Sequence, residues 1–141
     1  MVMKKLLLTI ALAAPAGLVH AGELQSAAAD EYQACLKESE QARKECSFGG
    51  CGNILGACYE RQIAVFENDS AQVARGLKQG ACAESAETIN EQFAELERRL
   101  LKVEQFNDTW SGLDLRVELA AAKNRALSLA AAECATTEKV P

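Results

Sequence analysis

The stretch Glu87-Thr-Ile-Asn-Glu-Gln-Phe-Ala-Glu-Leu-Glu-Arg-Arg-Leu-Leu-Lys-Val-Glu-Gln105 is the clearest helical segment of the 141-residue chain. Its large apolar residues recur at alternating steps of four and three positions, which places them on one stripe of a helix. The stripe comprises Ile89, Phe93, Leu96, Leu100 and Val103. The opposite face is mostly charged and amide side chains. A helix of this kind needs a partner surface, so we expect the rest of the chain to supply one.

Three other segments keep the same rhythm and are separated by turn-forming residues such as those of Ser47–Asn53 and Asn107–Gly112. Helices are predicted over about Ser26–Cys46, Ile54–Lys78, Ser85–Gln105 and Leu113–Ala135. The only prolines are Pro15 and Pro141, so no helix breaker lies between them. We therefore predict an all-α fold, a disulfide-linked antiparallel helical bundle of about four helices. A distorted three-helix array is the alternative.

Each of these helices has an expected inner stripe. The first is expected to bury Ala28, Tyr32, Cys35, Ser39, Ala42 and Cys46. The second is expected to bury Tyr59, Ile63, Phe66, Ser70, Val73 and Leu77. The last is expected to bury Leu115, Leu119, Ala122, Ala126 and Leu129. The segment Asn68–Ser70 could split the second helix, because its side chains compete with the backbone for hydrogen bonds. Gly80 is expected to stop that helix.

The first 21 residues have the three regions of a secretory signal peptide: a basic start, a short apolar run and a small-residue end at Val19–Ala21. The apolar run Leu6–Ala14 is too short to span about 30 Å of hydrocarbon, and Pro15 interrupts it. We predict cleavage after Ala21, which leaves residues 22–141 as a single helical domain without a membrane span. The mature protein is expected to be periplasmic or secreted.

Removing this segment makes the chain more acidic and takes away its only histidine, His20. Without Lys4 and Lys5, 13 basic side chains remain against 20 acidic ones, so the net charge moves from −5 to −7. The loss of the imidazole excludes most familiar enzyme constellations, and we predict no catalytic residue. Nucleic-acid binding is disfavoured too, because phosphate neutralisation needs clustered Lys or Arg. Redox catalysis by cysteine is not indicated either, because the chain has no C-x-x-C.

The six cysteines all lie in the part expected to be exported: Cys35, Cys46, Cys51, Cys58, Cys82 and Cys134. An even number in an exported chain predicts three disulfides. Their spacing matches no common zinc pattern, and C-x-x-C-H, which would attach haem, is absent. We therefore predict neither a metal nor another cofactor.

The second half of the chain resembles a known family in the order and spacing of its motifs. These motifs are Cys82-Ala83, Ile89-Asn90-x-x-Phe93-x-x-Leu96, Leu119 and Ala132-Glu133-Cys134. They are similar to those of the LprI-type lysozyme-inhibitor N-terminal family, which comprises small exported helical proteins. The resemblance is strongest over residues 82–134 and extends more vaguely back to Tyr32.

The chain also departs from the family pattern. Ile89 and Phe93 replace Leu and Tyr, which preserves the apolar character of the helix. Ala126 and Leu129 replace Trp and Tyr, so the most recognisable part of the closing motif is missing.

The resemblance implies that Cys82 pairs with Cys134. The other four cysteines then allow three pairings, of which Cys46 with Cys58 is attractive because both lie close to the glycine-rich turn. For Asn90, we favour a structural role, in which its amide bonds a neighbouring helix, over contact with a ligand.

The function that the resemblance implies is binding to a protein partner such as a lysozyme. Lysozymes are generally basic, so an acidic partner gains association rate from long-range attraction. The candidate binding element is the Asn107–Asp114 loop, where Trp110 could act as an apolar anchor flanked by Asp108 and Asp114. The structural alternative for Trp110 is that it caps the bundle core. The functional alternative is a structural or accessory envelope protein acting through helix–helix contacts, and the oligomeric state is left open.

Overall fold

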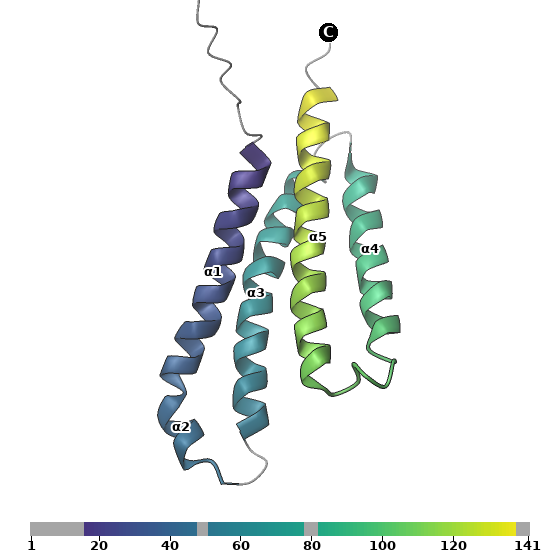
Figure 1. Cartoon of the computed structure of the whole chain (residues 1–141). Helices are drawn as coiled ribbons and strands as arrows, with labels where there is room; N and C mark the ends of the chain where they lie inside the picture. The colour runs from purple at the N-terminus through teal and green to yellow at the C-terminus, as the bar shows by residue number, and fades with distance from the viewer. Residues whose placement is uncertain (1–15, 48–50, 78–81, 138–141) are drawn as a thin grey trace, which may run out of the picture.

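The computed structural model describes residues 16–47, 51–77 and 82–137 (Figure 1). Within these residues it contains α-helices and no strand, which confirms the all-α prediction. The helices are α1 (Ala16–Glu38), α2 (Glu40–Glu45), α3 (Cys51–Leu77), α4 (Ala83–Leu100) and α5 (Trp110–Thr137). No helix among them is long and apolar enough to cross a membrane.

Some of the sequence predictions fall outside the described residues. These are residues 1–15 of the expected signal peptide, residues 48–50 of the glycine-rich turn, Gly80 and the last residues of the tail. Helix α1 begins at Ala16 and runs without a break past Ala21, the last residue before the expected cleavage site.

The long helices lie side by side in the spatial order α1, α3, α5, α4 (Figure 1). Helices that follow one another in the chain run in opposite directions, but the central pair, α3 and α5, is parallel. Helix α1 packs mainly against α3, and α4 packs mainly against α5, while α1 and α4 are not in close contact. The result is a flattened array around a parallel pair, which differs from a bundle in which every neighbour is antiparallel.

Two small clusters of buried side chains form the core along the central pair. The first joins α1, α3 and α5 through Ala28, Ile63, Phe66 and Ala120. The second joins α3, α4 and α5 through Ala74, Leu77, Ala86 and Leu127. Half of these residues are alanines, whose small side chains allow the helix backbones to approach closely.

A polar contact lies between the two clusters. Asn124 of α5 is 3% exposed, and its Nδ2 donates to Asp69 Oδ2 at 2.7 Å and to Ser70 Oγ at 3.3 Å. A buried amide is costly to leave without partners, so this contact favours one register of α5 against α3.

Asn124 also explains why the predicted inner stripe of the last helix was partly wrong. Ala122 is exposed and Leu129 is 60% exposed, whereas Asn124 and Leu127 are buried. A pattern of apolar residues does not reveal a buried amide, and the many alanines of α5 indicate no single face.

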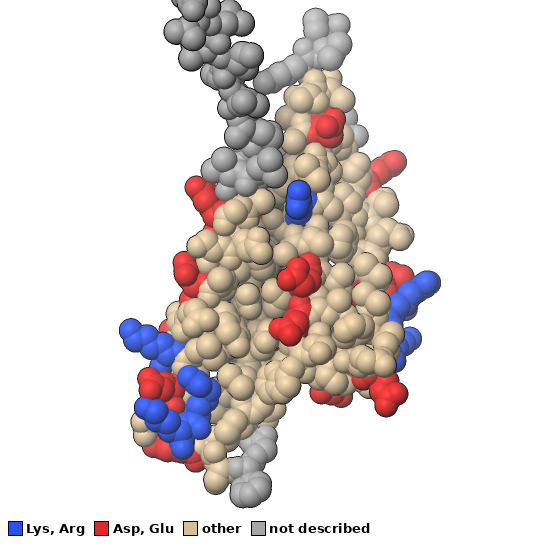
Figure 2. Space-filling view, in the orientation of Figure 1, with Lys and Arg blue, Asp and Glu red and all other residues tan. Residues whose placement is uncertain are grey.

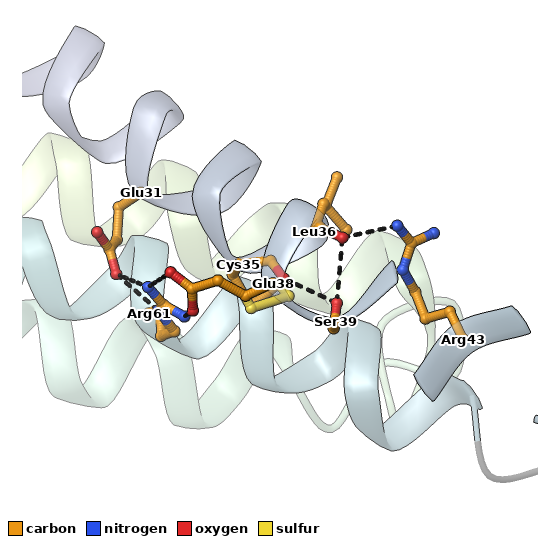
Figure 3. Close-up of a disulfide and its surroundings, with 8 residues drawn as sticks. Glu31, Cys35, Leu36, Glu38, Ser39, Arg43 and Arg61 are labelled. Atoms are coloured by element: carbon orange, nitrogen blue, oxygen red, sulfur yellow. Dashed lines mark hydrogen bonds and ion pairs between the residues drawn. A yellow bond between two sulfur atoms is a disulfide. The ribbon is translucent and has the colours of Figure 1, made fainter. Parts of the chain in front are cut away.

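The predicted first helix is interrupted at Ser39, which separates α1 from the short α2. Ser39 Oγ donates to the carbonyl oxygen of Cys35 at 2.7 Å, and Arg43 Nη2 donates to that of Leu36 at 2.8 Å (Figure 3). Serine hydroxyls that bond back to the preceding turn bend helices. Ala42, predicted to face inward, is therefore exposed on α2.

The second predicted helix agrees well with α3. Ile63, Phe66, Ser70 and Leu77 are buried as expected, and Tyr59 and Val73 are half-buried. The helix begins at Cys51, three residues earlier than predicted, and does not split at Asn68–Ser70. It remains continuous because Asp69 and Ser70 bind Asn124 of α5.

The third predicted helix ends early, at Leu100 instead of Gln105. Its stripe is only partly covered: Ala86 is the buried residue of α4, while Leu96 and Val103 are 42% and 40% exposed. Helix periodicity shows which residues share a face, but it does not show how far the partner surface extends.

All six cysteines are paired. Cys82 pairs with Cys134, as predicted, with their Cα atoms 6.1 Å apart. The suggested pairing of Cys46 with Cys58 is wrong, because Cys35 bonds Cys58 and Cys46 bonds Cys51. The antiparallel packing of α1 on α3 brings Cys35 level with Cys58, and the interruption at Ser39 separates Cys46 from this contact.

The Cys35–Cys58 disulfide is accompanied by ion pairs between the same two helices (Figure 3). Arg61 of α3 contacts Glu31 and Glu38 of α1, each at 2.5 Å. Hydrogen bonding to the Arg61 guanidinium lowers the pKa of the Glu38 carboxyl. These pairs are solvent-exposed, so the disulfide and the first core cluster are the stronger links between α1 and α3.

Candidate partner-binding site

The connection between α4 and α5 is built from tight turns. The backbone N–H groups of Phe106 and Asn107 both donate to the carbonyl oxygen of Val103, at 2.9 and 3.0 Å. Asp108 follows with φ of 51°, in the left-handed region, which aspartate tolerates better than most side chains. The loop therefore has a defined backbone conformation.

Helix α5 begins at Trp110, three residues before its predicted start, because Thr109 caps it. Thr109 Oγ1 accepts a hydrogen bond from the backbone N–H of Gly112 at 3.1 Å and donates to the carbonyl oxygen of Gln105 at 2.7 Å. The first bond satisfies a free N–H group of the first helical turn. The second ties the cap to the preceding turn.

Gly112 allows the loop to fold back onto the start of α5. A Cβ atom at this position would overlap the carbonyl oxygen of Phe106 and lie 3.0 Å from its carbonyl carbon. This close backbone approach requires glycine.

Trp110 is 51% exposed, and its indole packs against another aromatic ring. Its ring centroid is 6.3 Å from that of Tyr59 in α3, and the Tyr59 centroid is 5.1 Å from that of Tyr32 in α1. The three aromatic residues thus form a row across α1, α3 and α5. The tryptophan is held by this row and does not fill the buried core.

Asp114 lies one helical turn after Trp110 and accepts a hydrogen bond from the Tyr59 hydroxyl at 2.9 Å. Partial burial and this hydrogen bond, in that order, raise the pKa of Tyr59 to about 12. The bond holds Tyr59 in place beneath Trp110.

A hollow of about 690 Å³ lies beside the loop. Asp108 and Trp110 both line it, together with Phe106, Leu113 and Arg116. Of the three predicted site residues, Asp108 and Trp110 therefore share one hollow, while Asp114 does not line it and instead contacts Tyr59. Tyr59 was expected only as a core residue, and no local signal connected it with a tryptophan so distant in the sequence.

The family-motif residues lie elsewhere, on α4. Ile89 packs against the second core cluster, Leu96 is largely exposed, and Asn90 and Phe93 line a groove of about 510 Å³ between α3, α4 and α5. Asn90 is half-buried, and among the described residues its side chain makes no hydrogen bond. The expected hydrogen bond between the Asn90 amide and a neighbouring helix is therefore not observed among the described residues.

Within the described ranges, no group of three or more His, Cys, Asp or Glu side chains could hold a metal ion. Comparison with known proteins finds no match to a family model, to a curated protein or to a solved structure. The Trp110 loop and the groove are therefore the features of the molecule on which a proposed function can rest.

Replacing Gly112 with alanine should destabilise the protein by about 1–3 kcal/mol, because the added methyl group displaces the backbone of Phe106. Urea unfolding of the oxidised protein measures this cost. Gly56 is the matched control, since it lies inside α3 with open space around its Cα. Gly56→Ala should stabilise the protein by about 0.5–1 kcal/mol. Equal changes in the free energy of unfolding for the two substitutions would contradict the close approach of the Phe106 backbone to Gly112.

The raised pKa of Tyr59 predicts a loss of stability at high pH. The folded state binds the phenolic proton more tightly than the unfolded chain, so this contribution is intact below pH 10 and is lost as the pH rises towards 12. Titration of tyrosinate absorbance should resolve Tyr59 as a late step that Tyr59→Phe removes. Asp114→Asn should lower the raised pKa of Tyr59 only in part, because burial raises that pKa more than the hydrogen bond does. A Tyr59 step near pH 10 would contradict this contact.

Proposed function

We propose that the protein is an exported helical binding protein that acts like the LprI-type lysozyme inhibitors it resembles. In this proposal, the Trp110 loop enters the cleft of a basic partner, and a lysozyme is the first candidate. No catalytic step and no cofactor are part of the proposal.

The observation that carries the proposal is the exposure of Trp110 on a fixed support. Trp110 is 51% exposed to solvent, yet the Tyr59 ring packs against its indole. Thr109 also caps α5, the helix that begins at Trp110. Exposed aromatic residues that are already held in place make good interface anchors, because little conformational entropy is lost on binding. Asp108 and Asp114 add negative charge next to the indole.

The overall charge favours a basic partner. Figure 2 shows carboxylates scattered from one end to the other of the face in view, while most of the cations on that face gather at the α2 end and at the edge formed by α4. The net charge of the full chain is −5. Such an imbalance increases the association rate with a cationic protein and is screened by salt.

The second candidate function is a structural or accessory envelope protein that binds through helix–helix contacts. The specific observation in its favour is that the apolar stripe of α4 is incompletely covered, since Leu96 is 42% exposed. Size-exclusion chromatography with light scattering separates the two candidates. A stable homo-oligomer that buries the Trp110 loop would count against insertion into a cleft.

A turbidity assay of lysozyme on peptidoglycan, with and without the oxidised mature protein, tests the proposal. We expect inhibition, and we expect Trp110→Ala to weaken it by roughly 30-fold or more, about 2 kcal/mol, as for an interface anchor. Leu129→Ala is the matched control, because Leu129 is also a large exposed apolar residue of α5 but lies far from the loop.

The control variant should inhibit like the wild type. Absence of inhibition of several lysozyme types at micromolar protein would refute the proposed partner. Equal inhibition by the Trp110 and Leu129 variants would refute the proposed anchor.

A further inference from the structure

The groove between α3, α4 and α5 is lined by the same pattern on each helix. Every helix contributes residues at positions i, i+3, i+4 and i+7, which is one face of two helical turns. The lining residues are Glu60, Ile63, Ala64 and Glu67 on α3, Asn90, Phe93, Ala94 and Glu97 on α4, and Arg116, Leu119, Ala120 and Lys123 on α5.

The middle of this groove is apolar and its ends are polar. The i+3 and i+4 positions of all three helices are apolar, and Ile63, Phe93 and Leu119 are the largest of them. At one end, Arg116 forms ion pairs with both Glu60 and Glu97, the latter at 3.0 Å. At the other end, Lys123 pairs with Glu67, beside Asn90. The groove is therefore a two-turn apolar slot with an ion-pair layer at each end.

The carboxylates of these layers face the solvent more than the cations do. The side chains of Arg116 and Lys123 are 27% and 17% exposed, whereas those of Glu60, Glu67 and Glu97 are 54%, 44% and 40% exposed. The cations lie deeper and are paired with these carboxylates, which outnumber them by three to two. An approaching surface therefore meets apolar side chains framed by negative charge.

The slot also lies where a further helix would complete the packing of α4. Helix α4 has one apolar stripe, but it contacts α5 on one side and α3 only weakly. As a result, Phe93 and Asn90 remain half-buried in the groove.

From this geometry we infer that the groove binds a basic amphipathic helix of a partner protein. Two apolar residues of that helix, one turn apart, fill the slot beside Phe93, and its flanking Lys or Arg side chains meet the carboxylates of Glu60, Glu67 and Glu97. This is the helix-in-groove mode of recognition. A second copy of this chain fits less well, because it would bring its own net negative charge against the same carboxylates.

The groove and the hollow beside the Trp110 loop share only Arg116, whereas Ala64 lines the groove alone and Trp110 lines the hollow alone, so substitutions at these two positions test the sites independently. The probe is a blocked synthetic peptide of about 18 residues, five helical turns, with Leu on one face and Lys on the other. A second peptide has Glu in place of every Lys. Calorimetric titration of the full oxidised chain measures binding, and circular dichroism measures helix formation by the peptide.

We expect the lysine peptide to bind in a saturable one-to-one manner and the glutamate peptide not to bind. Ala64→Trp should fill the slot and weaken binding by about tenfold or more, since the indole occupies the volume that the anchors need. Ala64 is exposed in the free protein, so the variant should fold normally.

Two matched variants complete the experiment. Ala122→Trp makes the same substitution at an exposed position of α5 outside the groove and should bind like the wild type. Trp110→Ala should also bind normally, so failure of lysozyme inhibition and failure of groove binding can be told apart.

Three results would overturn the inference. The first is no binding of the lysine peptide to the folded protein. The second is equal binding by the Ala64 and Ala122 variants, which would mean non-specific attraction to an acidic surface. The third is a homodimer that Ala64→Trp dissociates, which would make a second copy the occupant.

Discussion

The packing of α5 against α3 is the contact on which the rest of the molecule depends. Alanines at positions 74 and 120 allow the two helices to lie close together, and Asn124 bonds Asp69 and Ser70 across them. Because this amide is buried, sliding or rotating α5 by one residue would leave it without partners, at a cost of about 1–3 kcal/mol. Helices α1 and α4 then attach on opposite sides of the central pair, and each is linked to it by a disulfide.

The packing of α5 on α3 positions both surfaces for which we propose a function, the Trp110 loop and the groove between α3, α4 and α5. With α5 fixed along α3, Trp110 at the start of α5 lies against Tyr59, and Asp114 reaches the Tyr59 hydroxyl. The same register aligns Arg116 with Glu60 and Lys123 with Glu67, which forms the two ends of the groove. A parallel pair of helices therefore positions an aromatic anchor at one end and a groove along its side.

The features that the sequence could predict are those set by local chemistry. The alternation of apolar residues predicted an all-α chain and most of the buried face of α3, and the family resemblance predicted the Cys82–Cys134 bond. Trp110 and Asp108 were recognised as surface candidates because a lone tryptophan in a turn-rich segment needs explaining.

The features that escaped prediction depend on particular hydrogen bonds, some of them local, and on contacts between distant residues. The interruption at Ser39, the early start of α5 and the burial of Asn124 are all decided by hydrogen bonds that composition does not reveal. Ser39 belongs to the predicted inner stripe of the first helix, and Asn124 is absent from the predicted inner stripe of the last helix. The pairing of Tyr59 with Trp110, like the alignment of the groove, appears only once the register of α5 on α3 is known.

Native-state hydrogen exchange of the oxidised protein tests most directly whether the α3–α5 pair is the centre of the fold. We expect the slowest-exchanging amides to lie in the parts of α3 and α5 around Asp69 and Asn124, and Asn124→Ala to accelerate amide exchange in both helices together. The carboxyl-terminal half of α4 should exchange faster, because its apolar stripe is only partly covered. Protection of α4 as strong as that of α3, or an effect of Asn124→Ala on α5 alone, would show that the α3–α5 pair is not the centre of the fold.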